Sequence, residues 1–157
     1  RRRVPAGPLL TRAASELGAS VVAPNEIYDA DCDVFAPCAM GGTINADTAP
    51  RLRAKIVCGA ANNQLASPAV GQMLVDRGIA YAPDYVVNAG GILNASGEFH
   101  GDYDLEEAWR KVNAIGDTTL QILETSAREQ RPSHEIADSM AEAILAQARE
   151  EKRPGQT

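Results

Sequence analysis

Short apolar runs alternate with helix-like segments along the first half of the chain. The runs are uninterrupted and cover residues 20–22, 33–36, 55–58 and 79–82. Such runs are typical of strands that are buried on both faces, as in a parallel sheet. The segments between them predict helices over residues 11–17, 48–53 and 68–77. Strands that alternate with helices indicate βαβ units and therefore an open α/β fold.

The last third of the chain follows a different pattern, with apolar residues at steps of three, four or seven. These steps predict a long helix over residues 104–127 and a second helix over 133–148. Asp104, followed three residues later by Glu107, resembles a capping box at the start of the first helix. We expect the apolar stripes of both helices to face the core, including Trp109, Met140, Ile144 and Leu145.

Composition places the chain among globular proteins and narrows its functions. Its 157 residues fit one domain, and 45% are hydrophobic while 23% are charged, which argues against a disordered chain. The net charge of −6 disfavours a nucleic-acid partner, because a surface that binds phosphates is basic. No apolar run approaches the roughly 18 residues of a membrane span, and no signal-peptide pattern follows the basic start.

The cysteines and the first residues add two expectations. Cys32, Cys38 and Cys58 are odd in number and form no Cys-x-x-Cys motif, which disfavours disulfides and zinc and suits the cytoplasm. Residues 1–10 hold three arginines, two prolines and a glycine. We expect them to form a disordered tail, with a basic arm for anions as the alternative.

Candidate chemistry lies in the loops that follow three of the predicted strands, because open α/β sheets bind ligands beyond the carboxyl ends of their strands. These loops cover residues 37–42, 59–64 and 83–91 and are rich in small residues. Asn62, Asn63 and Asn88 supply amides that suit a carboxamide or a carboxylate. The alternative is that these asparagines only cap turns and helices.

Other candidates carry less weight. Cys38 follows a strand, but no histidine lies near it in the sequence, and a buried cysteine usually behaves as a small hydrophobe. We expect His100 in a solvated loop and His134 in the first turn of a helix. The acidic residues near Asp104 fit a solvated loop and a helix N-terminus better than a metal site. We therefore expect no metal ligands and no catalytic residue in this chain.

Three blocks of sequence at these loops point to a family. Residues 32–42, 60–65 and 81–91 read CDVFAPCAMGG, AANNQL and YAPDYVVNAGG. They resemble the amino-acid dehydrogenases of the leucine, phenylalanine and valine type, in that family's order and at about its spacing. The resemblance extends from about Thr11 to about Ala148.

The resemblance implies a fold and an activity. The family reduces NAD while it converts an L-amino acid to a 2-oxo acid and ammonia, and its members are homo-oligomers. It implies that residues 11–157 form the distal part of a Rossmann-type NAD-binding domain, followed by C-terminal helices. The family's two catalytic lysines, catalytic aspartate and glycine-rich pyrophosphate loop have no match here, so we expect a fragment that is inactive alone. We also expect its unpaired sheet edge to promote self-association.

The resemblance also implies roles for individual residues. Ile92 and Ala95 would wall the pocket for the substrate side chain, and their apolar character favours an apolar amino acid over glutamate. Asn63 would bind the substrate carboxylate. The residues that would contact NAD are Cys38, Ala39, Met40, Gly59, Ala60, Ala61, Asn62 and Asn88.

Two other interpretations stay open at this point. The chain is alternatively a Rossmann-like binding or interaction module without catalysis. Another Rossmann enzyme, such as a hydroxy-acid dehydrogenase, would need a histidine beside an acid, and neither His100 nor His134 is placed for that role.

Overall fold

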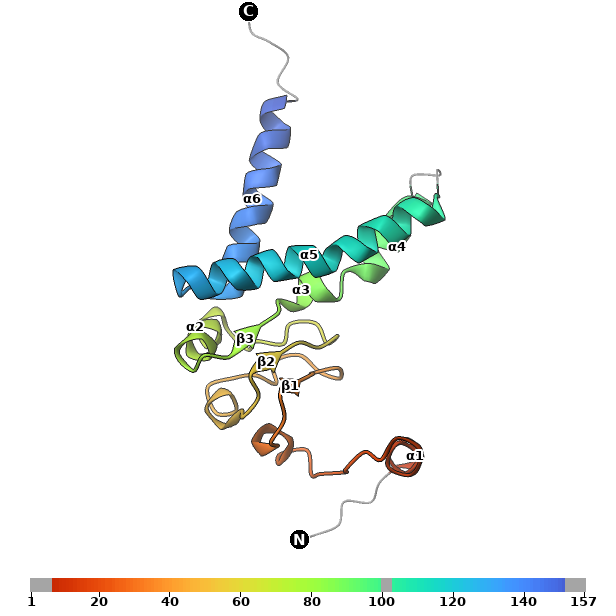
Figure 1. Cartoon of the computed structure of the whole chain (residues 1–157), viewed down its shortest axis with the longest axis vertical. Helices are drawn as coiled ribbons and strands as arrows, with labels where there is room; N and C mark the ends of the chain where they lie inside the picture. The colour runs from red at the N-terminus through yellow and green to blue at the C-terminus, as the bar shows by residue number, and fades with distance from the viewer. Residues whose placement is uncertain (1–6, 100–102, 152–157) are drawn as a thin grey trace, which may run out of the picture.

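A computed structural model of the chain describes residues 7–99 and 103–151. Three short parallel strands form a sheet in the order β1 (Val34–Phe35), β2 (Ile56–Val57) and β3 (Ala80–Tyr81). The sheet is followed by C-terminal helices, as Figure 1 shows. The predicted α/β fold is therefore confirmed. The helical elements are α1 (Pro8–Leu17), η1 (Ile27–Asp29), η2 (Ala49–Arg51), α2 (Pro68–Asp76), α3 (Asp84–Val87), α4 (Gly90–Phe99), α5 (Leu105–Glu129) and α6 (Ser133–Glu151).

The sheet differs from its prediction in extent. Each strand contains two residues and lies within the run that predicted it. Residues 20–22 form no strand, because no neighbouring strand within the described part of the chain pairs with their backbone groups. Val21 and Val22 are exposed instead.

The main core lies on one face of the sheet, beneath α2 and η2. Val57 and Tyr81 contribute the strand side of this core, and Leu52 and Leu74 pack against them from the helical side. The prediction that the strands are buried on both faces is wrong for β1 and β2. Val34 is 49% exposed and Ile56 is 38% exposed, and the main helical contacts of the sheet are those of α2 and α5 with β3.

The segment after β3 is helical where the sequence predicted a loop. Residues 83–91 contain the short helix α3 and the start of α4, and Pro83 precedes the first turn of α3. Helix α1 begins at Pro8, so the last residues of the expected tail are helical; a proline fits the first turn because its missing N–H needs no partner there. Residues 1–6 and His100 lie outside the described residues.

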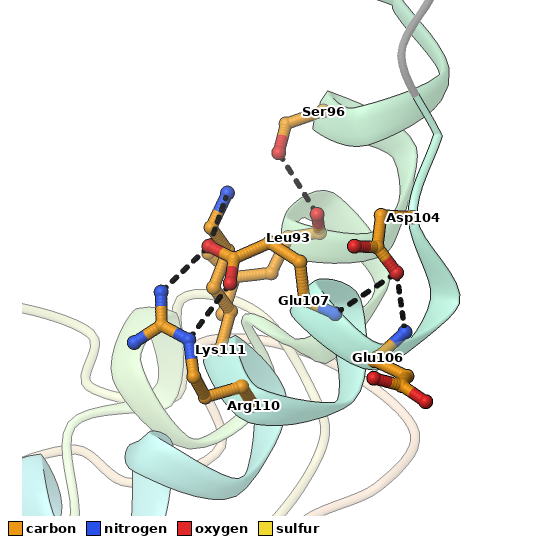
Figure 2. A network of polar contacts seen from close by, with 7 residues as sticks. All are labelled: Leu93, Ser96, Asp104, Glu106, Glu107, Arg110 and Lys111. Atoms are coloured by element: carbon orange, nitrogen blue, oxygen red, sulfur yellow. Dashed lines mark hydrogen bonds and ion pairs between the residues drawn. The ribbon is translucent and has the colours of Figure 1, made fainter.

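The two long C-terminal helices form as predicted. Figure 2 shows the start of α5, where Asp104 Oδ1 accepts hydrogen bonds from the backbone N–H groups of Glu106 at 2.9 Å and Glu107 at 3.4 Å. The Glu107 carboxylate turns to Arg110 and Lys111, and its hydrogen bond with Arg110 lowers its pKa. Asp104 is therefore the cap, while Glu107 belongs to a surface ion pair.

The packing of these helices corrects part of the prediction. Ile122 of α5 and Ile136 of α6 form a second core cluster, and Met140 packs against it as expected. Trp109 is 59% exposed, because the first half of α5 extends beyond the sheet and packs against α4 (Figure 1). Ile144 and Leu145 are also exposed, since the second half of α6 projects away from the sheet. Among the described residues, no helix is both long and apolar enough to cross a membrane.

The loops that follow β1 and β2 touch each other through a glycine. A Cβ atom placed on Gly59 would lie 2.2 Å from the carbonyl oxygen of Pro37 and 2.5 Å from its nitrogen. The Ala61 N–H also donates to the Pro37 carbonyl at 2.9 Å. Only glycine allows this approach, so the contact fixes where the second loop begins.

We predict that Gly59→Ala destabilises the chain by about 1–3 kcal/mol, because the backbone of Pro37 would have to move. The matched control is Gly116→Ala in α5, where a Cβ would meet nothing within 4 Å. That change should stabilise the chain by about 0.5–1 kcal/mol, since alanine costs less backbone entropy in a helix. Urea unfolding measures both. Equal midpoints for the two variants would contradict the account of Gly59.

Candidate functional site

The carboxyl ends of β2 and β3 open into a cleft of about 1110 Å³. One wall is the loop after β2, the second is α3 with the start of α4, and the third is the middle of α5. Position at the strand ends is expected for a ligand site in an open α/β sheet. The lining residues include Ala60, Asn62, Asn63, Asn88, Ile92 and Asn113.

Two asparagines from different strand ends meet in the cleft. Asn88 Nδ2 donates to Asn62 Oδ1 at 2.5 Å and lies 3.4 Å from the carbonyl oxygen of Ala60. Within residues 7–99 and 103–151, Asn62 Nδ2 and Asn88 Oδ1 have no other hydrogen-bond partner. The pair therefore offers one amide donor and one amide acceptor side by side. That combination is complementary to a carboxamide.

Asn63 lies beside this pair in an unusual backbone conformation. Its φ angle is 52°, in the left-handed region that asparagine tolerates better than most residues. Its carbonyl oxygen accepts a hydrogen bond from the Gly42 N–H at 2.7 Å, which ties the loop after β2 to the loop after β1. Asn63 thus acts as a turn residue through its backbone while its side chain lines the cleft.

Buried polar groups hold the loop after β2 in place on its side away from solvent. Gln64 is fully buried, and its side-chain Nε2 donates to the carbonyl oxygens of Gly59 at 2.7 Å and Ala61 at 2.9 Å. Its backbone N–H donates to Asp84 Oδ2 at 3.0 Å. The loop therefore folds around the Gln64 side chain, and the Gln64–Asp84 hydrogen bond attaches it to α3.

Asp84 is a buried carboxylate with a second donor. Only 7% of Asp84 is exposed, and the Tyr81 hydroxyl donates to its Oδ2 at 2.7 Å. Burial, reinforced by this hydrogen bond, raises the pKa of Tyr81 well above its usual value. Tyr81 is thus held in the protonated form that donates to the carboxylate.

Helix α3 is also fastened to α6. The Tyr85 hydroxyl donates to Asp138 Oδ1 at 2.6 Å, and its oxygen lies 3.1 Å from the carbonyl oxygen of His134. Burial and the hydrogen bond to Asp138 raise the pKa of Tyr85 as well. Ser133 Oγ donates to the carbonyl oxygen of Tyr81 at 2.5 Å. The start of α6 is therefore attached both to the end of β3 and to α3.

The structure brings together some of the residues that the sequence singled out and separates others. Asn62, Asn63, Asn88, Ala60 and Ile92 share the cleft. Ala95 lies one turn beyond Ile92 on α4, is exposed, and does not line the cleft. Gly59 and Ala61 are buried beneath the loop. The remaining three, Cys38, Ala39 and Met40, are exposed and line a separate apolar groove of about 520 Å³ beside β1.

Sequence reasoning missed the residues that support the site. Asp84, Tyr81 and Gln64 were read only as parts of strands and loops, and the α5 wall around Asn113 was not recognised. A local signal for Tyr81 and Asp84 does exist, because the two residues lie on either side of Pro83, which directly precedes helix α3. No sequence signal reveals that a buried amide and a buried carboxylate from different strand ends are bonded.

The other candidates have structural surroundings. His134 lies in the first turn of α6, and its ring packs so closely on Gly71 of α2 that a Cβ there would lie 2.4 Å from its Cε1. Both ring nitrogens are buried without a partner in the described part of the chain. Cys38 is a free, exposed cysteine, and no histidine lines the groove it borders. No cluster that could hold a metal ion occurs among the described residues.

The chain is an α/β protein whose parallel sheet gathers polar loops at the carboxyl ends of its strands, the place where open α/β sheets bind ligands. Residues 7–152 match the model of the Glutamate/Leucine/Phenylalanine/Valine dehydrogenase family. The chain belongs to this family.

Individual relatives agree with the family match. The leucine dehydrogenase of Thermoactinomyces intermedius is 50% identical over 131 residues, which cover 83% of this chain and 36% of that protein. The valine dehydrogenase of Streptomyces coelicolor is 47% identical over 147 residues, covering 89% and 39%. The crystal structure of L-tryptophan dehydrogenase from Nostoc punctiforme is 44% identical with a TM-score of 0.81, covering 87% and 42%. The chain thus spans only about two fifths of the length of these relatives.

We predict that Tyr81 makes the chain sensitive to alkaline pH. Because its pKa is raised in the folded state, the folded chain keeps a proton that the unfolded chain loses above pH of about 10. The stabilisation is therefore complete below that pH and is lost as the pH rises toward the folded-state pKa. In Tyr81→Phe, the free energy of unfolding should fall less steeply above pH of about 10 than in the unsubstituted chain. Identical slopes in urea unfolding across this range would refute the role of Tyr81.

Proposed function

We propose that this chain supplies the NAD-binding part of a dehydrogenase that converts an apolar L-amino acid to a 2-oxo acid and ammonia. Family membership and the leucine and valine dehydrogenases among its relatives support the reaction class. The complete reaction is proposed for this region joined to the rest of an enzyme of the relatives' length, because the match covers only 36% and 39% of those two relatives.

The observation that carries the proposal is the Asn62–Asn88 amide pair. A nicotinamide carboxamide has one oxygen acceptor and one NH₂ donor. In this proposal Asn62 Nδ2 would donate to that oxygen and Asn88 Oδ1 would accept from that NH₂ group, since the bond between the two asparagines leaves these atoms unused. The ribose would then lie along the loop at Ala60, which is exposed in the cleft, while the buried Gly59 and Ala61 would support the backbone on either side of it.

The groove beside β1 supports the placement of the other half of the cofactor. Cys38, Ala39 and Met40 offer an apolar wall against which an adenine ring packs. Two backbone hydrogen bonds join the loops that border the groove and the cleft: the Ala61 N–H donates to Pro37, and the Gly42 N–H donates to Asn63. We propose that one extended ligand follows these two loops, with its adenine end in the groove and its nicotinamide end in the cleft.

The chain's own residues would orient the reactants. NAD, when bound, accepts a hydride from the substrate Cα. The Asn62–Asn88 pair would hold the carboxamide so that one face of the ring meets the substrate, and Asn63 would hold the substrate carboxylate. Such positioning lowers the barrier because the reacting atoms need no further search for alignment.

The lining of the cleft supports a preference for apolar amino acids over glutamate. None of its described lining residues is lysine or arginine, so a second carboxylate, as in glutamate, would find no charged partner there. Ile92 is 71% exposed at the cleft and Ala95 shares its face of α4. We propose that these two residues contact the substrate side chain in the longer protein.

We predict that the chain binds NAD and that Asn62→Ala weakens this binding about tenfold, through loss of a hydrogen bond to the carboxamide. The matched control is Asn94→Ala on α4, which removes an amide that bonds Tyr103 and does not line the cleft. Isothermal titration of NAD into each purified chain measures the dissociation constants. Equal weakening by both variants would contradict the role of Asn62, and absence of binding to the unsubstituted chain would contradict the cofactor assignment.

We predict the substrate preference from a hybrid enzyme, in which this chain replaces the matching region of the Thermoactinomyces intermedius leucine dehydrogenase. The hybrid should reduce NAD with L-leucine, L-valine and L-phenylalanine. Ala95→Leu should lower kcat/KM for phenylalanine more than for valine, because the added bulk narrows the pocket by an amount worth about 1–3 kcal/mol. An unchanged ranking of the three substrates would remove Ala95 from the pocket wall.

A further inference from the structure

We propose that Asp84 is a positioning residue that sets the geometry of the Asn62–Asn88 amide pair and, through it, the affinity of the cleft for a carboxamide ligand. The second half of this statement rests on the proposed function, whereas the first half concerns the chain alone. Asp84 lines the cleft, but its carboxylate accepts hydrogen bonds from the Gln64 N–H and the Tyr81 hydroxyl and not from either asparagine side chain. Its effect therefore passes through the backbone of the loop and of α3.

The two ends of α3 both hold the loop after β2. At the first residue of the helix, Asp84 Oδ2 accepts from the Gln64 N–H at 3.0 Å. At the residue that caps its last turn, Asn88 Nδ2 donates to Asn62 Oδ1 at 2.5 Å. Asn62 lies two residues before Gln64 in the same loop, so the first contact fixes the backbone from which the second is made.

The link between the two ends is short and rigid. The Asn88 N–H donates to the carbonyl oxygen of Asp84 at 2.9 Å, which closes the single turn of α3. Asp84, Gln64 and Tyr81 are all buried, so water does not compete for these bonds. A displacement of the carboxylate is therefore transmitted to Asn62 on one side and to Asn88 on the other.

The Asp84 carboxylate has two acceptor oxygens and no donor of its own, which suits a position where two donors meet. Two donors, the Gln64 N–H and the Tyr81 hydroxyl, converge on one carboxylate oxygen. Hydrogen bonds to an ionised acceptor are about twice as strong as neutral ones. Asparagine has nearly the same shape, but its uncharged amide oxygen holds the two donors less firmly, and its NH₂ group cannot accept from either. Asp84→Asn should therefore loosen the loop with little change in volume.

The first experiment reads the geometry without any ligand. The side-chain NH₂ signals of Asn62 and Asn88 are recorded by NMR in the unsubstituted chain, in Asp84→Asn, and in the control Asp76→Asn. Asp76 is an exposed carboxylate on α2, and its Oδ1 accepts a hydrogen bond from Gln72 Nε2 at 2.8 Å. We expect Asp84→Asn to shift both NH₂ signals and to speed hydrogen exchange at the Gln64 amide, whereas Asp76→Asn leaves all three unchanged.

The second experiment measures the dissociation constant for NAD in a double-mutant cycle. NAD is titrated into Asp84→Asn, Asn62→Ala and the variant with both changes. If Asp84 acts through the pair, Asp84→Asn weakens NAD binding about tenfold in the unsubstituted background and has almost no further effect in Asn62→Ala. Additive effects would show that Asp84 only supports stability and would overturn the inference.

The two arms separate the inference from the proposed function. If NAD does not bind the unsubstituted chain, the proposed function fails, and the NMR arm still decides the positioning role. If the NH₂ signals do not move in Asp84→Asn, the positioning role fails whatever the NAD affinity. Should Asp84→Asn not fold, Asp84→Glu keeps the charge and displaces the carboxylate by one methylene, and the same shifts are expected. A chain that folds with neither substitution would identify Asp84 as a stability residue alone and overturn the inference.

Discussion

The hydrogen bond from the Gln64 backbone to the buried Asp84 carboxylate is the interaction on which the cleft depends. It joins the loop after β2 to the helix after β3, and those two segments carry the asparagines that meet in the cleft. Without it, the two strand ends would be held together mainly by the sheet, whose strands contribute two residues each. A binding site at the end of so short a sheet needs contacts in addition to the hydrogen bonds between its strands. The buried polar contacts supply them.

Backbone contacts between the loops after β1 and β2 also support the site. Gly59 lets the second loop rest directly on Pro37, and the Asn63 carbonyl receives the N–H of Gly42 from the first loop. Buried backbone groups need such partners, because an unpaired one costs about as much as a lost hydrogen bond. The donors that hold the loops, such as Gln64 Nε2 and the Gln64 N–H, are therefore buried and paired with backbone carbonyls or a buried carboxylate. The amides that face the cleft remain available for a ligand.

Much of the fold could be predicted from the sequence, because its signals are local. Patterns within a few residues were enough to predict the strands, the Asp104 cap and the two long helices. The strand patterns are the apolar runs at residues 33–36, 55–58 and 79–82. Trp109 and residues 20–22 were misjudged, because their environment is set by which elements pack nearby and not by their own pattern. Asn62, Asn63 and Asn88 could be singled out from their loops. The Asp84–Gln64 and Tyr81–Asp84 bonds could not, since periodicity does not report pairs of buried polar groups across a fold.

The most direct test of the account is a crystal structure of the chain with NAD. The account predicts that the nicotinamide carboxamide lies in the cleft, with its oxygen within hydrogen-bond distance of Asn62 Nδ2 and its nitrogen within that distance of Asn88 Oδ1. It also predicts that the Gln64–Asp84 bond is retained. A cofactor whose carboxamide contacts neither asparagine would contradict the claim that the paired strand ends form the recognition site.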